Sequence, residues 1–184
     1  MTELASPGQL RAAFIRWALV LVPGIVLLGF VSGRIANAGP GNAWFDALTK
    51  PAIYPPPAAF GIVWSILYVM MGVALAMVVA ARGARWRGVA IAAFAVQFLL
   101  NLAWTPVFFA GHQITAGLAV IGVLDVAVLV TIVLFARIRP AAAWMLAPYL
   151  AWVLFATALN YEFLRANPDA DGKANPGAVT RIEI

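Results

Sequence analysis

The stretch AVQFLLNLAWTPVFFAG, residues 95–111, is almost entirely apolar, yet it contains Gln97, Asn101 and Pro106. A transmembrane helix needs about 20 mostly apolar residues, and this run with its flanks is long enough. Polar side chains in hydrocarbon tend to face the interior of a helix bundle. The two amides therefore either bridge neighbouring helices or line a site. Pro106 lacks the N–H that would bond the carbonyl of Leu102, which predicts a kink and leaves that carbonyl to a side chain or water.

The composition of the whole chain is that of an integral membrane protein. Of its 184 residues, 64% are hydrophobic and 10% are charged, whereas soluble domains carry about 25% charged residues. The absence of cysteine excludes disulfides, thiolate metal sites and a cysteine nucleophile. The net charge of +5 indicates loop topology and contact with anionic lipid rather than with nucleic acid, because no basic helix or RNA-binding motif accompanies it.

Five windows are long and apolar enough to span a membrane, so we predict an all-α membrane protein built as a bundle of five transmembrane helices. The spans run roughly over 14–33, 59–81, 89–110, 114–136 and 141–164, within a single domain of residues 1–167. The start of the chain resembles a signal peptide, but its apolar run from Trp17 to Ser32 is long for one. We expect residues 168–184 to form a polar, disordered tail.

Lysine and arginine near the span ends predict the orientation. With five spans, the N-terminus shares a side with 82–88 and 137–139, and that side holds Arg11, Arg16, Arg82, Arg85, Arg87, Arg137 and Arg139. The other side has fewer basic residues near the membrane, namely Arg34, Lys50 and Arg165. We therefore expect a cytoplasmic N-terminus, with the long loop 34–57 on the opposite side.

Polar and aromatic side chains recur at helical spacing in three of the predicted spans. Residues at i, i+3, i+4 and i+7 share a helix face, and those that do so are Phe60, Trp64, Tyr68 and Met71 in the second span, Gln97, Asn101, Trp104, Thr105 and Phe108 in the third, and Tyr149, Trp152, Ala156, Asn160 and Phe163 in the fifth. If the faces converge, they wall a cavity for a large, flat, mostly apolar ligand. Alternatively, the rings are interior packing and the amides form interhelical hydrogen bonds worth about 0.6–2 kcal/mol each.

The loop 34–57 contains two segments with a structure of their own. KPAIYPPP (50–57) favours an extended polyproline conformation. The preceding NAWFDALTK can form a short amphipathic helix with Trp44, Phe45 and Leu48 on one face. The loop either covers a cavity as a lid or lies on the headgroups with aromatic anchors.

Asp125 lies near the middle of the fourth span, where an ionisable residue is a functional candidate by default. No lysine or arginine of another span can pair with it, so it is protonated, lies at an oligomer contact or serves as a proton site. The chain shows no nucleophile–base pair, metal-ligand cluster or paired carboxylates. We therefore expect no catalytic residue, no metal site and no required cofactor.

Four motifs carry a resemblance to a known family, namely WFDALTKPAIYPPP (44–57), VWSILYVMMG (63–72), NLAWTPVFF (101–109) and APYLAWVLFATALNYEFLRAN (147–167). In order and spacing they resemble the TspO/MBR family, which includes the tryptophan-rich sensory proteins of bacteria and the mitochondrial translocator protein. The resemblance covers roughly residues 40–167.

This resemblance implies a homodimeric five-helix bundle in a bacterial cell membrane, with a loop-capped pocket for porphyrins (protoporphyrin IX or haem) and, in some members, sterols. The matching motifs add Trp64, Asn101, Trp104, Trp152 and Ala156 to the pocket. Together with the helix faces and the loop, the predicted ligand-binding residues are Trp44, Phe45, Trp64, Tyr68, Gln97, Asn101, Trp104, Phe108, Tyr149, Trp152, Ala156 and Asn160. Leu159, Tyr161 and Arg165 form a candidate sterol motif.

Three functions stay open at this point. The first is the binding of porphyrin-like ligands for transport or for sensing of stress, oxygen or light. The second is light-driven degradation of bound porphyrin, which some family members promote, although Phe45 stands where those members have a tyrosine. The third is a small proton-coupled transporter with Asp125 as its proton site. The expected partners are membrane lipid, a porphyrin-like molecule, a sterol and a second copy of the chain, and nucleic acid is not among them.

Overall fold

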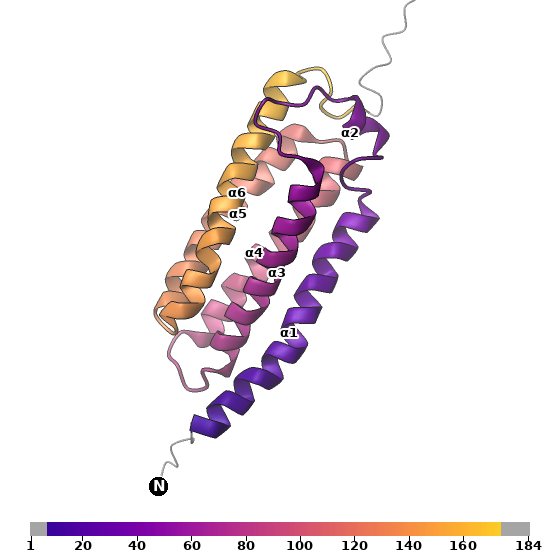
Figure 1. Ribbon diagram of the computed structural model, residues 1–184. Helices are drawn as coiled ribbons and strands as arrows, with labels where there is room; N and C mark the ends of the chain where they lie inside the picture. The colour runs from indigo at the N-terminus through magenta and orange to yellow at the C-terminus, as the bar shows by residue number, and fades with distance from the viewer. Residues whose placement is uncertain (1–6, 174–184) are drawn as a thin grey trace, which may run out of the picture.

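The computed structural model describes residues 7–173, and in this range the chain is a bundle of long helices without strands (Figure 1). The elements are α1 (Pro7–Ile35), α2 (Ala43–Ala47), α3 (Pro57–Ala80), α4 (Arg87–Thr105), the π-helical turn η1 (Pro106–Ala110), α5 (Ile114–Ala136) and α6 (Pro140–Ala166). Five helices are long and apolar enough to cross a membrane, with α4 and η1 forming one span. The predicted all-α fold with five spans is confirmed.

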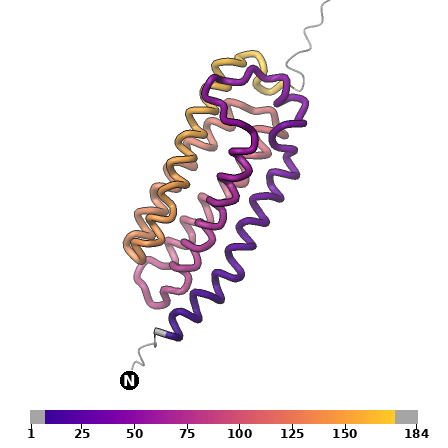
Figure 2. The backbone as a smooth tube through the Cα atoms, in the orientation of Figure 1, coloured from indigo at the N-terminus to yellow at the C-terminus, as the bar shows by residue number. Residues whose placement is uncertain are grey.

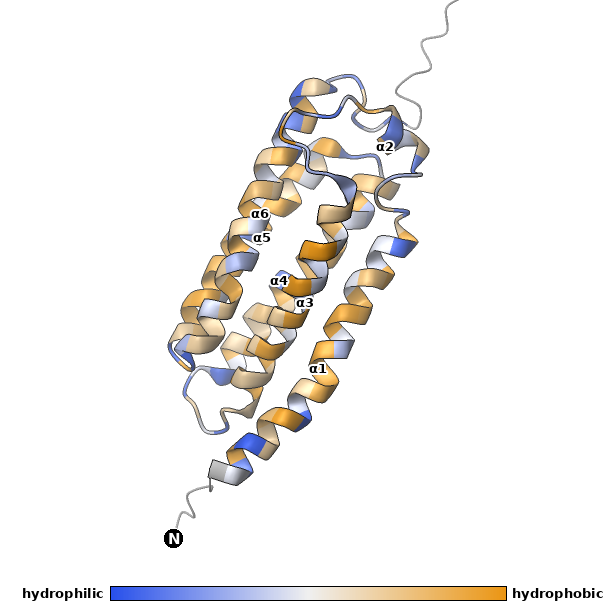
Figure 3. Ribbon diagram, in the orientation of Figure 1, coloured by the Kyte–Doolittle hydropathy of each residue, from blue (hydrophilic) through white to orange (hydrophobic). Residues whose placement is uncertain are grey.

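The five spans form a ring in which sequence neighbours are not always spatial neighbours. Helix α3 packs on α1 and α6, and α5 packs between α6 and α4. The start of α1 lies at one end of the bundle with the connections 81–86 and 137–139, while α2 and the end of α6 lie at the other end (Figure 2). Apolar residues cover the spans and polar residues gather at both ends (Figure 3). The assignment of one end to the cytoplasm stays a prediction.

Prolines fix where two of the spans begin. Pro57 and Pro140 lie in the first turns of α3 and α6, where a missing N–H has no intrahelical partner to lose. Pro56 has φ −53° and ψ 138°, so the chain enters α3 extended, as the polyproline pattern predicts. The extended stretch is shorter than predicted, because a turn closes at 51–54 with a 2.9 Å hydrogen bond from Tyr54 N to Pro51 O.

The proline in the opening motif changes the type of helix rather than simply bending it. From Pro106 the α-helix continues as a π-helical turn, in which Gly111 N donates to Pro106 O at 2.8 Å. The carbonyl of Leu102, which lacks the N–H of Pro106 as a partner, accepts a 2.8 Å hydrogen bond from Ser32 Oγ of α1. Of the two partners predicted for this carbonyl, a side chain or water, the structure shows a side chain.

Two glycines let α1 and α3 approach closely. A Cβ atom on Gly72 would lie 2.7 Å from Val22 Cα, and a Cβ atom on Gly29 would overlap the ring of Tyr68. Such small-residue contacts bring helix backbones together in membranes, where packing replaces the hydrophobic effect as the driving force. The close approach places Gly29 beside the aromatic face of α3.

Residues 167–173, which we call the strap, differ from the predicted disordered tail. Asp171 Oδ1 accepts hydrogen bonds from Ile114 N (2.6 Å) and Thr115 N (3.2 Å), which caps the first turn of α5. Gly172 N donates to His112 O at 2.8 Å. The strap therefore folds back onto the bundle because its polar groups find partners at a helix N-terminus. The rest of the predicted tail, 174–184, lies outside the described residues.

Candidate functional site

A cavity of about 350 Å³ lies inside the bundle at the end that carries α2. All five spans contribute to its wall, α5 with only Ile121 and Leu124, and the loop between α1 and α3 contributes the rest. The lining residues are Gly29, Phe30, Gly33, Arg34, Ala38, Gly39, Pro40, Phe45, Tyr54, Pro57, Phe60, Gly61, Trp64, Tyr68, Asn101, Trp104, Thr105, Phe108, Phe109, Ile121, Leu124, Trp152, Val153, Ala156, Leu159, Asn160 and Phe163. The volume falls within the range of about 300–1,000 Å³ typical of small-molecule sites.

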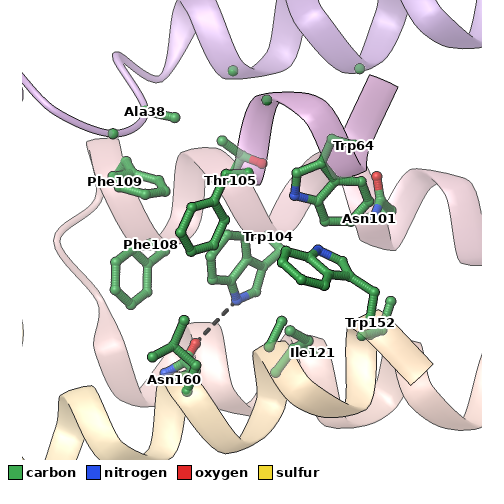
Figure 4. A pocket seen from close by; sticks show the side chains of 18 of the residues that line it. Ala38, Trp64, Asn101, Trp104, Thr105, Phe108, Phe109, Ile121, Trp152 and Asn160 are labelled. Carbon is green, nitrogen blue, oxygen red and sulfur yellow. Dashed lines mark hydrogen bonds between the residues drawn. The ribbon is translucent and has the colours of Figure 1, made fainter. Parts of the chain in front are cut away.

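Aromatic rings from three helices form the inner wall. Trp64 of α3, Trp104 of α4 and Trp152 of α6 surround one space (Figure 4). The ring of Trp64 stacks on Tyr68 with centroids 5.2 Å apart, and Trp104 stacks on Phe108 at 5.1 Å. The helix faces predicted from periodicity therefore do converge on one cavity.

Most polar groups in the wall already have protein partners. Tyr68 OH donates to Asn101 Oδ1 at 3.3 Å. Trp104 Nε1 donates to Asn160 Oδ1 at 3.1 Å (Figure 4), and Asn160 Nδ2 donates to Ile114 O at 3.0 Å. These bonds fix the ring of Trp104 and the side chain of Asn160.

Trp152 is different, because its Nε1 is buried and has no acceptor among the described residues. A buried N–H without a partner costs about 1–3 kcal/mol. Trp152 lines the cavity, where its ring meets Phe60 edge-on with centroids 5.8 Å apart. A ligand acceptor placed beside this indole would remove the penalty.

The loop between α1 and α3 closes the end of the cavity as a lid, which we define as residues 36–56. Asn42 Oδ1 accepts from Phe45 N at 3.0 Å and so caps α2, while Asn42 Nδ2 donates to Asn37 O (3.1 Å) and Phe109 O (3.2 Å). Phe45 lines the cavity. This position fits the predicted lid, and the placement of the loop relative to the headgroups stays a prediction.

The other end of α2 is closed by a lysine. Lys50 Nζ donates to the carbonyls of Phe45 and Leu48 and lies 4.2 Å from the centre of the Phe45 ring. Burial lowers the pKa of Lys50, and the carboxylate of Asp46 opposes that shift. The ammonium thus holds the backbone of the lid at the point where Phe45 enters the cavity.

The strap fastens the lid from outside. Thr49 N donates to Asn167 Oδ1 at 2.8 Å, and Asn167 Nδ2 donates to Thr49 O at 3.0 Å. Trp44 Nε1 donates to Ala170 O at 3.4 Å, and its ring stacks on His112 with centroids 4.8 Å apart. Trp44 is therefore turned toward the strap and away from the cavity.

The sequence profile of the TspO/MBR family matches residues 19–165. The chain belongs to the TspO/MBR family. The predicted resemblance is thereby confirmed, and the match includes α1 from residue 19, the lid, α3, α4, α5 and α6 up to residue 165.

Named relatives within the TspO/MBR family cover most of the chain. The tryptophan-rich protein TspO of Chlorobaculum tepidum is 38% identical over 154 residues, which is 82% of this chain and 96% of the relative. The tryptophan-rich sensory protein of Cereibacter sphaeroides is 37% identical over 126 residues, 68% of this chain and 78% of the relative. The human translocator protein is 36% identical over 140 residues, 75% of this chain and 82% of the relative.

Within this TspO/MBR bundle, most of the predicted ligand-binding residues line the cavity, namely Phe45, Trp64, Tyr68, Asn101, Trp104, Phe108, Trp152, Ala156 and Asn160. Trp44, Gln97 and Tyr149 do not. Gln97 and Tyr149 are fully buried and bond to each other, with Tyr149 OH donating to Gln97 Oε1 at 2.9 Å. For this pair, the interpretation as an interhelical hydrogen bond describes the geometry.

The candidate sterol motif divides between two surfaces. Leu159 is buried and lines the cavity, whereas Tyr161 is half exposed and Arg165 is exposed and paired with Glu162 at 3.2 Å. A sterol that contacts Tyr161 and Arg165 would therefore lie on the outer face of α6, apart from the cavity.

Helix α1 is the contributor that the sequence reasoning missed. Gly29, Phe30, Gly33 and Arg34 all line the cavity. The small-residue spacing in GFVSG (29–33) is typical of a helix-packing motif. The same spacing also marks one face of α1, which could have placed that face opposite the rings of α3.

Asp125 lies outside the cavity lining and faces α6. Its Oδ2 accepts a 2.8 Å hydrogen bond from Thr157 Oγ1, while its buried Oδ1 has no partner within residues 7–173. No cation in that range pairs with it. Asp125 is therefore part of the contact between α5 and α6 and not of the cavity wall.

Proposed function

We propose that this protein binds a flat, mostly apolar, porphyrin-like ligand in the cavity and that this binding serves transport or sensing at the membrane. The observation that carries the proposal is the wall of Trp64, Trp104 and Trp152 around one space, with the Nε1 of Trp152 lacking a protein acceptor. Stacked or edge-on rings contribute about 0.5–1.5 kcal/mol per pair beyond the area that they bury.

The charge at the lid end suits the acidic substituents of a porphyrin. Among the described residues that line the cavity, Arg34 is the only charged one, and its side chain is exposed. A guanidinium binds a carboxylate in a bidentate geometry. A porphyrin with its macrocycle between the indoles and a propionate near Arg34 would use both features.

The two roles, transport and sensing, are supported by the relatives rather than by the cavity alone. One relative is named a tryptophan-rich sensory protein and another a translocator protein. Both roles require a reversible ligand site inside a membrane bundle, and the aromatic wall beneath the lid supports the proposal of such a site. A sterol on the outer face of α6 is a separate, weaker hypothesis that rests on Tyr161 and Arg165.

The experiment is a titration of purified protein with protoporphyrin IX. Binding is measured from the Soret absorption band of the porphyrin, because loss of an indole does not itself change that signal. Trp152→Phe keeps a ring but removes the N–H, and loss of one hydrogen bond of about 1 kcal/mol predicts roughly fivefold weaker binding. Trp152→Ala should weaken binding further. Trp144→Phe is the matched control, because Trp144 is 77% exposed and does not line the cavity.

Unchanged affinity in Trp152→Ala combined with Asn101→Leu would remove the site assignment. The same samples under illumination distinguish binding from light-driven degradation. If the Soret band decays no faster with protein than in detergent alone, the protein binds porphyrin without degrading it.

A further inference from the structure

A second hollow, of about 390 Å³, lies between α3 and α6 and is lined only by apolar residues. Val63, Ile66, Leu67 and Met70 come from α3, and Pro148, Ala151 and Trp152 come from α6. We call it the α3–α6 groove. Ile66, Pro148 and Ala151 are exposed, and the residues lie well inside the two membrane-crossing helices. The medium in contact with this groove is therefore the hydrocarbon of the bilayer.

Trp152 belongs to both hollows. It lines the inner cavity together with the other two indoles, and it also lines the α3–α6 groove. One side chain thus separates the ligand cavity from the lipid-facing surface of the bundle. The inner cavity meets the surface elsewhere, on the α1 side of α3, where the lining residues Phe30, Arg34 and Gly61 are exposed.

The side chain that forms this partition is held more weakly than the other closures of the cavity. Trp104 is fixed by a hydrogen bond to Asn160, and the lid is fixed by Asn42 and Lys50. Trp152 has only ring contacts, with Phe60 at 5.8 Å and Phe155 at 5.3 Å between centroids, and no hydrogen bond. A rotation of Trp152 would break packing contacts but no polar contact.

We propose that the α3–α6 groove is a membrane-side entrance that admits flat, uncharged, apolar molecules from the bilayer to the cavity, with Trp152 as the movable partition. An uncharged ligand matches a passage lined by apolar side chains without a charged group, since a carboxylate there would lose its hydration without gaining a cationic partner. Only the indole of Trp152 separates the groove from the cavity. The molecule that enters the groove is therefore one that the cavity can also hold. This inference rests on the proposed function, because it supplies a route to the same cavity.

The test measures how fast protoporphyrin IX dimethyl ester, which carries no charge, moves between lipid vesicles and protein reconstituted in them. Two variants fill the groove from opposite sides, Ala151→Phe on α6 and Ile66→Phe on α3. Their matched controls are Ala158→Phe and Ile62→Phe, which alter exposed positions of the same helices outside the groove. All four positions face lipid, so folding is preserved, and thermal unfolding in detergent verifies it.

We expect both groove variants to slow association and dissociation by the same factor, about tenfold, which corresponds to a barrier raised by 1.36 kcal/mol. The equilibrium affinity stays unchanged, because an entrance alters both directions equally, whereas a merely structural role would change the affinity. Unchanged exchange rates of the ester in the groove variants, or equal slowing in the control variants, would overturn the proposal of an entrance.

The outcomes also separate this inference from the proposed function. If wild-type protein binds neither protoporphyrin IX nor its ester, the proposed function fails and the entrance fails with it. If wild-type protein binds both and the groove variants exchange the ester at the wild-type rate, only the entrance fails.

Discussion

The lid end and the helical wall of the cavity are held by different combinations of contacts. At the lid end, a short segment buries Trp44, Phe45 and Leu48. The same end also has hydrogen bonds from Asn42, Lys50 and Asn167 to backbone groups. In the wall, long helices are held by ring contacts, and the polar side chains bond mainly between helices, such as Tyr68 to Asn101. The lid thus combines ring packing with bonds to backbone groups, whereas the wall depends mainly on shape.

This difference follows from the surroundings of each part. Near water, a buried backbone group without a partner costs about 1–3 kcal/mol. Removing a side chain that bonds to such a group therefore has a large effect on stability. Inside hydrocarbon, side-chain hydrogen bonds between helices average only about 0.6 kcal/mol, because the separated helices also find partners. Substitutions in the two regions should therefore differ in size, which the following changes test.

The largest effect is expected for Asn42→Leu in the lid. This change leaves the N–H of Phe45 and the carbonyls of Asn37 and Phe109 without the partner that Asn42 gives them. We expect the free energy of opening the lid to fall by about 3 kcal/mol. Limited proteolysis within residues 36–56 and hydrogen exchange of the Phe45 amide measure it.

Asn42→Asp is the matched control for that change. It keeps the acceptor for Phe45 N but loses both donors, so its cleavage rate should lie between those of wild type and Asn42→Leu. Cleavage of Asn42→Leu at the wild-type rate would show that the lid is held by its aromatic contacts instead.

A smaller effect is expected for Asp171→Ala in the strap. The substitution removes the cap on Ile114 N and Thr115 N, and loss of a helix cap costs about 1 kcal/mol. Thermal unfolding in detergent should report the loss, while Asp169→Ala, an exposed position in the same strap, should not. Equal midpoints for the two variants would contradict the capping role of Asp171.

The smallest effect is expected for Tyr149→Phe in the wall. It removes one hydrogen bond, from Tyr149 OH to Gln97 Oε1, and keeps the ring against Trp64. We expect about 0.6 kcal/mol of destabilisation and unchanged affinity for protoporphyrin IX, since neither partner lines the cavity. A tenfold loss of affinity would return Gln97 and Tyr149 to the ligand site.

The Gln97–Tyr149 pair also shows what helical periodicity can and cannot predict. Spacing of three and four residues correctly placed Gln97 on the same face as Asn101 and Trp104. The spacing gave the direction of each side chain but not its distance from the lid along the helix axis. The cavity occupies only the lid end of that face. Gln97 and Tyr149 therefore point inward at a level where the helices already touch.

Hydropathy placed all five spans but began the first near residue 14, whereas α1 begins at Pro7. The thickness of the hydrocarbon limits the length of the apolar run but not the length of the helix.

Other differences arise from contacts between segments far apart in the sequence. The hydrogen bond from Ser32 to the carbonyl of Leu102 is one such contact, and the hydrogen bond between the strap and the start of α5 is another. No local sequence pattern reveals the partners in these bonds. The proline rule predicted that a donor was needed at Leu102 but could not name it.

The strap has a consequence for the order in which the protein is assembled. The pair between Thr49 and Asn167 joins residues separated by 118 positions, and Trp44 and Ala170 are separated by 126. Contacts of such long range form late, because chain entropy opposes them until the intervening segments are in place. The ribosome releases residues 167–170 only after all five spans, so a nascent bundle has a lid held by Asn42 and Lys50 but not yet by the strap. During membrane insertion the lid is therefore easier to open than in the finished protein.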